Sequence, residues 1–142
     1  MLGFGESALS IYLNDHLSGA TVGLELARRV VPGELASEID QDRAVLIDVM
    51  ERLSVGRDRA RIAIGWGTEK VLRLKPGGRF SELETLSLGV EGKLVLWQAL
   101  DRAYGDDPRL QGIDLDALSA RARSQRRRIE QRRLDAAGKA LR

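Results

Sequence analysis

The chain has 142 residues, of which 43% are hydrophobic and 31% charged, with one histidine and no cysteine. This length and composition predict one domain with a buried core and exclude a disordered chain. The lack of cysteine excludes a disulfide framework and a thiolate metal site. Because the N-terminus has no signal-peptide pattern and no apolar run is long enough to span a bilayer, we expect a soluble cytoplasmic protein without membrane association.

Charge is distributed unevenly along the chain. Residues 121–142 hold nine Arg or Lys and two acidic residues, a local balance of +7 within a formal net charge of +2, which leaves residues 1–120 at −5. An acidic body with a basic tail can attract nucleic acid, an acidic protein partner, or the acidic body of a second copy.

Residue periodicity predicts two long helices at the start of the chain, from about Ser7 to Val31 and from about Glu34 to Ser54. Their core stripes, spaced by three or four residues, are Leu9, Leu13, His16, Ala20, Gly23, Ala27 and Val30, then Leu35, Ile39, Asp42, Leu46, Val49 and Leu53. The short join at residues 32–33, a Pro-Gly pair, predicts an antiparallel hairpin.

A third segment, from about Asp58 to Leu74, is predicted as a shorter helix, with a β-hairpin as the alternative because its apolar residues also alternate. The next helix is expected to open with a capping box of Ser81 and Glu84 and to run to Tyr104. Its core stripe is Leu86, Val90, Lys93, Trp97 and Leu100.

The last predicted helix covers about residues 114–140 and begins after Asp114, whose carboxylate can accept from the first amides. Its stripe is Leu115, Leu118, Ala122, Gln125, Ile129 and Ala136. The chain is therefore predicted to be one all-α domain over 1–142, an antiparallel bundle of four or five helices with two hairpins joined by the short third helix. A plain up-and-down five-helix bundle is the alternative.

Small residues recur within the predicted helices, although a glycine there costs roughly 1 kcal/mol relative to alanine. These residues are Gly19, Ala20, Gly23, Gly65, Gly67, Gly89 and Gly92. We expect them to mark close helix–helix approach; the alternative is a notch for a ligand or a partner helix.

Four polar residues interrupt the apolar stripes: His16, Asp42, Lys93 and Gln125. Because buried polar groups must be paired, we expect a core polar network that fixes helix register, for example Asp42 with Lys93 or His16. The alternative is a metal or small-ligand site.

The two-hairpin layout and the carboxylates inside long helices resemble ferritin-like bundle proteins. These carboxylates are Glu25, Glu38, Asp42, Glu91 and Glu130, and the run of residues 12–20, YLNDHLSGA, is similar to small bacterial members of that group. The resemblance covers most of the chain and implies a divalent metal (Fe, Mn or Zn) held by His16, Glu38, Asp42 and Glu91. The Glu-x-x-His motif of di-iron members is absent.

The last predicted helix carries a basic face formed by Arg121, Arg123, Arg126, Arg127, Arg128, Arg132 and Arg133. We expect a solvated face with ion pairs to Glu130 or Asp135; the alternatives are docking of an acidic neighbour and phosphate contact with nucleic acid. No catalytic motif is evident. The sequence therefore favours a non-catalytic structural or interaction protein without a cofactor that forms a homo-oligomer, a dimer or larger. The alternatives are a ferritin-like metal-binding protein and a nucleic-acid-associated protein.

Overall fold

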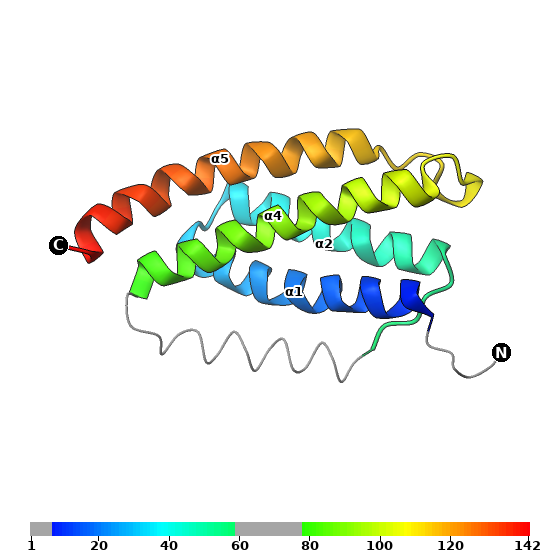
Figure 1. Cartoon of the computed structure of the whole chain (residues 1–142), viewed down its shortest axis with the longest axis horizontal. Coiled ribbons are helices and arrows are strands. Elements are labelled where there is room, and N and C mark those ends of the chain that lie inside the picture. Colours follow the sequence, from blue (N-terminus) through cyan, green and yellow to red (C-terminus); the bar gives the residue numbers. More distant parts are fainter. Residues whose placement is uncertain (1–6, 59–77) are drawn as a thin grey trace.

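The computed structural model describes residues 7–58 and 78–142, and within these ranges the protein is all-helical with no strand. Figure 1 shows a bundle of four long helices. Their bounds are α1 Ala8–Val30, α2 Glu34–Arg52, α4 Gly78–Tyr104 and α5 Leu115–Ala140, with a short 3-10 helix, η2, at Pro108–Leu110. The predicted all-α class is confirmed for the described residues, and α1, α2 and α5 end within two residues of their predicted limits.

The helices pack as two hairpins. The helix α1 contacts α2 and α4, and α4 contacts α5 along much of its length. Within each hairpin the helices are antiparallel, whereas α2 and α4 run in the same direction (Figure 1). This direction agrees with both predicted layouts, the two hairpins joined by a third helix and the plain up-and-down five-helix bundle, and the segment that distinguishes them is not among the described residues. The predicted third segment lies almost entirely outside the described residues, as do Gly65 and Gly67.

Local signals set three of the helix ends. The Ser7 hydroxyl accepts from the Ser10 amide at 3.0 Å at the start of α1. The predicted cap Asp114 accepts from the amide of Ala117 at 2.9 Å at the start of α5. At the end of α4, a Cβ on Gly105 would lie 2.5 Å from the carbonyl oxygen of Asp101, so only glycine fits there without rearrangement.

The predicted capping box of α4 is wrong. The helix begins at Gly78, so Ser81 lies inside its first turn rather than before it. The carboxylate of Glu84 pairs instead with Arg133 of α5, 3.1 Å away. Glu84 thus takes part in an ion pair between helices, which a local sequence pattern does not predict.

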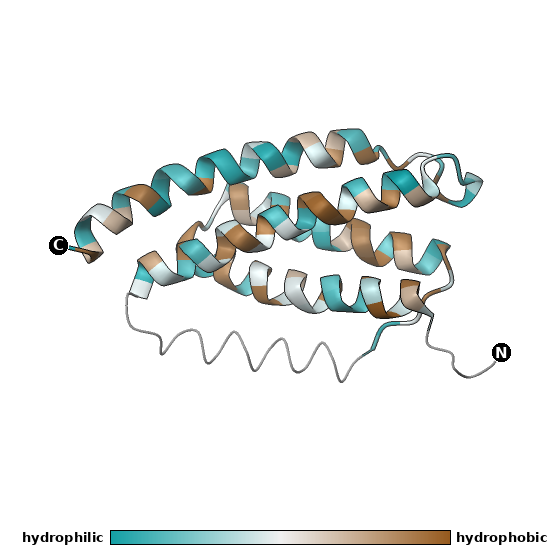
Figure 2. Cartoon of the chain, viewed as in Figure 1, coloured by the Kyte–Doolittle hydropathy of each residue, from teal (hydrophilic) through white to brown (hydrophobic). Residues whose placement is uncertain are grey.

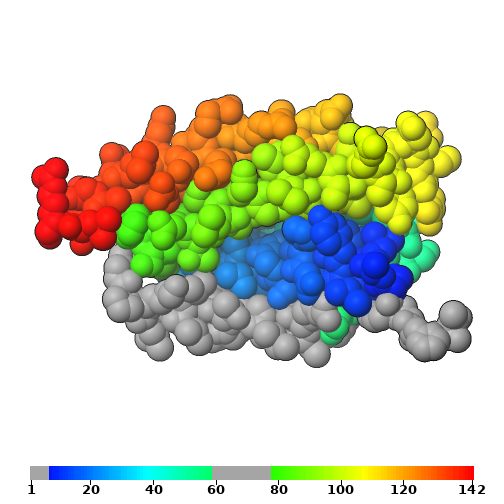
Figure 3. Space-filling model, viewed as in Figure 1, coloured from blue at the N-terminus to red at the C-terminus, as the bar shows by residue number. Residues whose placement is uncertain are grey.

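The core contains most of the predicted apolar stripe residues and is continuous between the hairpins. It also contains buried leucines outside the predicted stripes, among them Leu17 and Leu83. Leu13, Leu46, Trp97 and Ile129, one from each helix, are at most 2% exposed. Figure 2 shows hydrophobic residues on the inner sides of the helices and a largely hydrophilic α5. In the space-filling view, α5, α4 and α1 lie side by side on one face of the molecule (Figure 3).

Candidate functional site

Asp42 of α2 is the most thoroughly buried charge among the described residues, with a side chain 1% exposed. Its Oδ2 accepts from Lys93 Nζ of α4 at 2.6 Å and from Gln125 Nε2 of α5 at 2.9 Å. Its Oδ1 accepts from both Nε, at 3.1 Å, and Nη2 of Arg121. Both carboxylate oxygens are thus engaged by donors from the two neighbouring helices.

The hydrogen bonds continue from Asp42 along α5. Gln125 accepts from Lys93 Nζ at 2.6 Å and donates to Glu38 Oε1 at 3.2 Å. Arg128 clasps the same Glu38 carboxylate with two hydrogen bonds of 2.7 and 3.1 Å. We call these six residues, Glu38, Asp42, Lys93, Arg121, Gln125 and Arg128, the Asp42 cluster.

The electrostatics of the cluster follow from burial and pairing. The hydrogen bonds from Arg128 lower the pKa of Glu38, and this effect exceeds the opposing effect of burial. Burial lowers the pKa of Lys93, while the nearby carboxylate of Asp42 acts in the opposite direction. Because Asp42 accepts at both oxygens and Lys93 is bound to it, the arrangement acts as a clamp that joins α2, α4 and α5.

Three of the four residues predicted to form the core polar network meet in this cluster, and His16 does not. His16 lies on α1, where its ring packs edge-on against Tyr12 with centroids 4.7 Å apart. Burial lowers the pKa of His16, opposed by the charge of Asp15. No hydrogen bond joins His16 to the described residues of the Asp42 cluster.

The set His16, Glu38, Asp42 and Glu91 does not assemble as a metal centre. Within residues 7–58 and 78–142, no group of three or more His, Asp or Glu side chains is placed to hold a metal ion. Glu38 and Asp42 are bound by cationic side chains, and Glu91 pairs with Arg126 at 3.2 Å. These donors therefore do not fit the divalent metal that the ferritin-like resemblance implies.

The basic face of α5 divides into inner and outer arginines. Arg121, Arg126, Arg128 and Arg133 pair with acidic residues of α2 or α4. The outer ones, Arg123, Arg127 and Arg132, are exposed, as expected of a solvated face. Arg133 also pairs with Glu130 within α5, as predicted. The inner arginines therefore differ from the predicted solvated face, because they pair with acidic residues in the body of the same chain.

Sequence reasoning did not identify two polar contacts. The sequence pattern predicts Arg121 only as part of the basic face, yet Arg121 binds the most buried carboxylate of the described residues. The charge balance of +7 against −5 is the sequence signal that indicates such pairing. The buried Asn14 donates to the carbonyl of Gly56 at 3.0 Å and accepts from the amide of Asp58 at 2.7 Å. Asn14 thereby holds the chain after α2 against α1. No local sequence pattern predicts such a contact.

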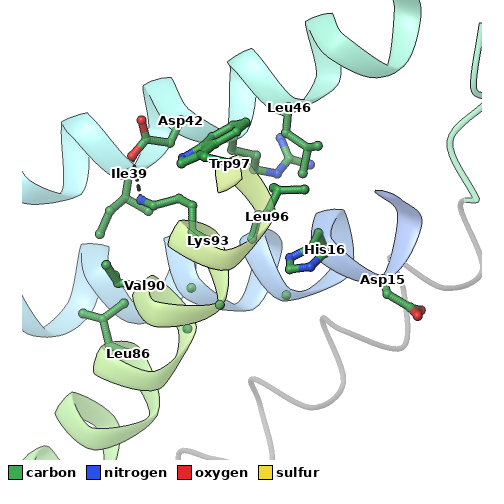
Figure 4. Close-up of a pocket in the computed structure, with 16 residues that line it drawn as sticks. Asp15, His16, Ile39, Asp42, Leu46, Leu86, Val90, Lys93, Leu96 and Trp97 are labelled. Carbon is green, nitrogen blue, oxygen red and sulfur yellow. Dashed lines mark hydrogen bonds and ion pairs between the residues drawn. The ribbon is translucent and has the colours of Figure 1, made fainter. Parts of the chain in front are cut away.

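A pocket of about 190 Å³ opens between α1, α2 and α4. Its walls include Gly19, Gly23, Gly89 and Gly92, and a Cβ built on any of these would meet no atom of the described residues within 4 Å. Close approach between the described helices therefore does not explain these glycines. Figure 4 shows Asp42 and Lys93 on one side of the pocket and His16 on the other. The Asp42 cluster thus borders a cavity.

No protein-family model, curated protein or solved structure matches the chain. The described residues place the protein in the class of all-α helical bundles. None of the helices in these ranges is long and apolar enough to cross a membrane.

Proposed function

We propose that this protein is a non-catalytic helical-bundle module with a ferritin-like layout that self-associates through the outer face of α4. The layout is supported by the direction of the helices: two antiparallel hairpins with α2 and α4 parallel, as in four-helix bundles with one long crossover (Figure 1). The absence of a role in catalysis is supported by the pairing of Asp42, both of whose carboxylate oxygens accept hydrogen bonds within the bundle.

The observation that carries the proposal is an apolar stripe on the outer face of α4. We call Leu88, Gly92, Val95 and Ala99 the outer α4 stripe; their spacing of four, three and four residues is that of a coiled-coil seam. Leu88 is 65% exposed and Val95 is 51% exposed. A second apolar seam on a helix whose core seam is already buried is available for a partner helix.

A second copy fits this stripe when its α4 runs antiparallel. With the centre between Gly92 and Val95, Leu88 of one copy faces Ala99 of the other, and Val95 faces Gly92. A large side chain then lies opposite a small one in every layer, which is the complementarity that helix packing requires. Such a contact is twofold symmetric and closes as a dimer.

Charge at the two ends of the stripe agrees with this orientation. Glu84 and Arg102 are exposed and lie on the same flank of α4, about five helical turns apart. An antiparallel copy brings Glu84 of each protomer toward Arg102 of the other. A parallel copy would place like charges together.

Sedimentation velocity of the full chain and two variants tests the proposal. We expect Leu88→Glu to dissociate the wild-type assembly, because it replaces the largest apolar side chain of the contact with a charge. Leu134→Glu is the matched control, since Leu134 is a similarly exposed leucine, 59% accessible, on α5. A monomeric wild type, or dissociation by both substitutions alike, would contradict the proposal.

A further inference from the structure

The pocket between α1, α2 and α4 has the size and lining of a small-ligand site. Its volume of about 190 Å³ exceeds that of an engineered apolar cavity of about 150 Å³ that binds benzene, so a ligand of about eight non-hydrogen atoms would fill it. Its walls are mainly aliphatic: Ile39, Leu46, Leu86, Val90 and Leu96. Concave apolar sites with a few polar groups are typical of small-molecule binding.

At the end of the pocket next to Asp42, two hydrogen-bond donors remain available. Trp97 is fully buried and lines the pocket, and its indole Nε1 has no hydrogen-bond partner among the described residues. In Figure 4 this nitrogen is on the side of the ring toward Asp42 and Lys93. Lys93 Nζ carries three donors, of which Asp42 and Gln125 take two. A buried donor without an acceptor is uncommon enough to require an explanation.

The charge around these donors favours an anion. Lys93 and Arg121 both bind the one carboxylate of Asp42. Arg43 adds a further cation to the pocket lining, and the nearby carboxylate of Glu38 is paired with Arg128. Asp15 lies exposed at the pocket rim, opposite this end. Burial lowers the pKa of His16, so the imidazole on the pocket wall is neutral at pH 7.

We propose that this pocket binds a short aliphatic carboxylate, whose oxygens accept from Lys93 Nζ and Trp97 Nε1 while its hydrocarbon tail lies against the aliphatic wall. A carboxylate supplies the acceptors that the orphaned donor lacks and balances the local positive charge. The glycines at positions 23 and 89 leave room for the tail. Gly92 of the outer α4 stripe also lines the pocket. The proposed ligand contacts, Lys93 Nζ and Trp97 Nε1, are not part of that stripe, so ligand binding does not require self-association.

Titration with hexanoate, which has eight non-hydrogen atoms, tests the proposal by nuclear magnetic resonance of the ¹⁵N-labelled full chain. The chain has two tryptophans, and Trp66→Phe assigns the indole resonance of Trp97. We expect a saturable shift of the Trp97 indole N–H with a dissociation constant of about 1 mM, in keeping with so small a ligand. Hexan-1-ol, which has the tail but no charge, should bind at least about tenfold more weakly.

Variants that fill the pocket provide the control. Gly23→Leu from α1 and Gly89→Leu from α4 each place a side chain in the cavity and should abolish the hexanoate shift. Gly138→Leu makes the same substitution in α5 outside the pocket, and it should leave binding unchanged. Circular dichroism reports whether each variant is folded. No shift at about 10 mM hexanoate, equal binding of hexan-1-ol, or binding retained in a folded pocket-filling variant would overturn the proposal.

Discussion

Asp42 lies inside the bundle, where Lys93, Gln125 and Arg121 together supply hydrogen bonds to both of its oxygens. A buried ion pair adds little net stability compared with a well-packed apolar pair, since desolvation offsets the attraction. Removing one partner of the pair is strongly destabilising, because the remaining charge stays buried without a compensating charge. The cluster therefore specifies how α2, α4 and α5 fit together more than it adds to their stability.

We predict that Asp42→Asn lowers the free energy of unfolding by about 3 kcal/mol, because it leaves Lys93 with a 14% exposed side chain beside Arg121 and no anion at that position. Asp48→Asn is the matched control on the same helix. Asp48 pairs with Arg52 at a site where the two side chains are 48% and 36% exposed, so its loss should cost under about 0.5 kcal/mol. Urea unfolding at pH 7 measures both, and similar costs would contradict a structural role for Asp42.

Glu38 should make stability depend on pH in the acid range. Its pKa in the folded state is lowered below the ordinary value of 4.5, chiefly by the hydrogen bonds from Arg128. A carboxyl with a lowered folded-state pKa stabilises the fold above the unfolded-state pKa, and this stabilisation disappears as the pH falls through the folded-state pKa. Its contribution is therefore complete at neutral pH and declines below about pH 4.5.

The expected result is that Glu38→Gln loses less unfolding free energy than the wild type between about pH 6 and about pH 3.5. Glu51→Gln, at an exposed position of the same helix, should retain the wild-type pH dependence. Urea unfolding across this range measures the slopes. If Glu38→Gln and the wild type had the same slope, Arg128 would not be stabilising the ionised carboxylate.

At the scale of elements, the helices could be predicted where their signals are local. The Pro-Gly join after α1 and the cap at Asp114 each act on the nearest turn, and α1, α2 and α5 end close to the predicted residues. A capping box at Ser81 predicts a later start for α4 than Gly78, where the helix begins, and the carboxylate of Glu84 pairs instead with Arg133 on another helix. The partner of such a carboxylate depends on contacts between helices, and a local sequence pattern does not predict those contacts.

The candidate site was likewise predictable only in part. Asp42, Lys93 and Gln125 interrupt apolar stripes, and burial alone requires that such residues find partners. Arg121 lies on the flank of its helix and reaches Asp42 only because its side chain is long. The glycines indicate where side chains are missing from a helix face, but the sequence does not show whether a neighbouring helix fills the space beside them. At Gly23 and Gly89, the described residues leave this space open.

Over the whole molecule, much of the charge separation along the chain is balanced within it. The basic tail forms α5, and its inner arginines lie against carboxylates of α2 and α4. Fewer cations therefore remain to bind the acidic body of a second copy. Such ionic binding is the alternative to association through the outer α4 stripe. The two modes differ in salt dependence, since screening weakens exposed ion pairs but not apolar contacts.

Sedimentation equilibrium of the wild-type chain at about 0.1 M and about 1 M NaCl, where the Debye length falls from about 10 Å to about 3 Å, tests this account most directly. Association through Leu88 and Val95 predicts a mass average above the 15.7 kDa of one chain that rises with protein concentration and persists in high salt. A mass of 15.7 kDa at every concentration would contradict self-association. An assembly that dissociates only in high salt would contradict the apolar stripe as its interface.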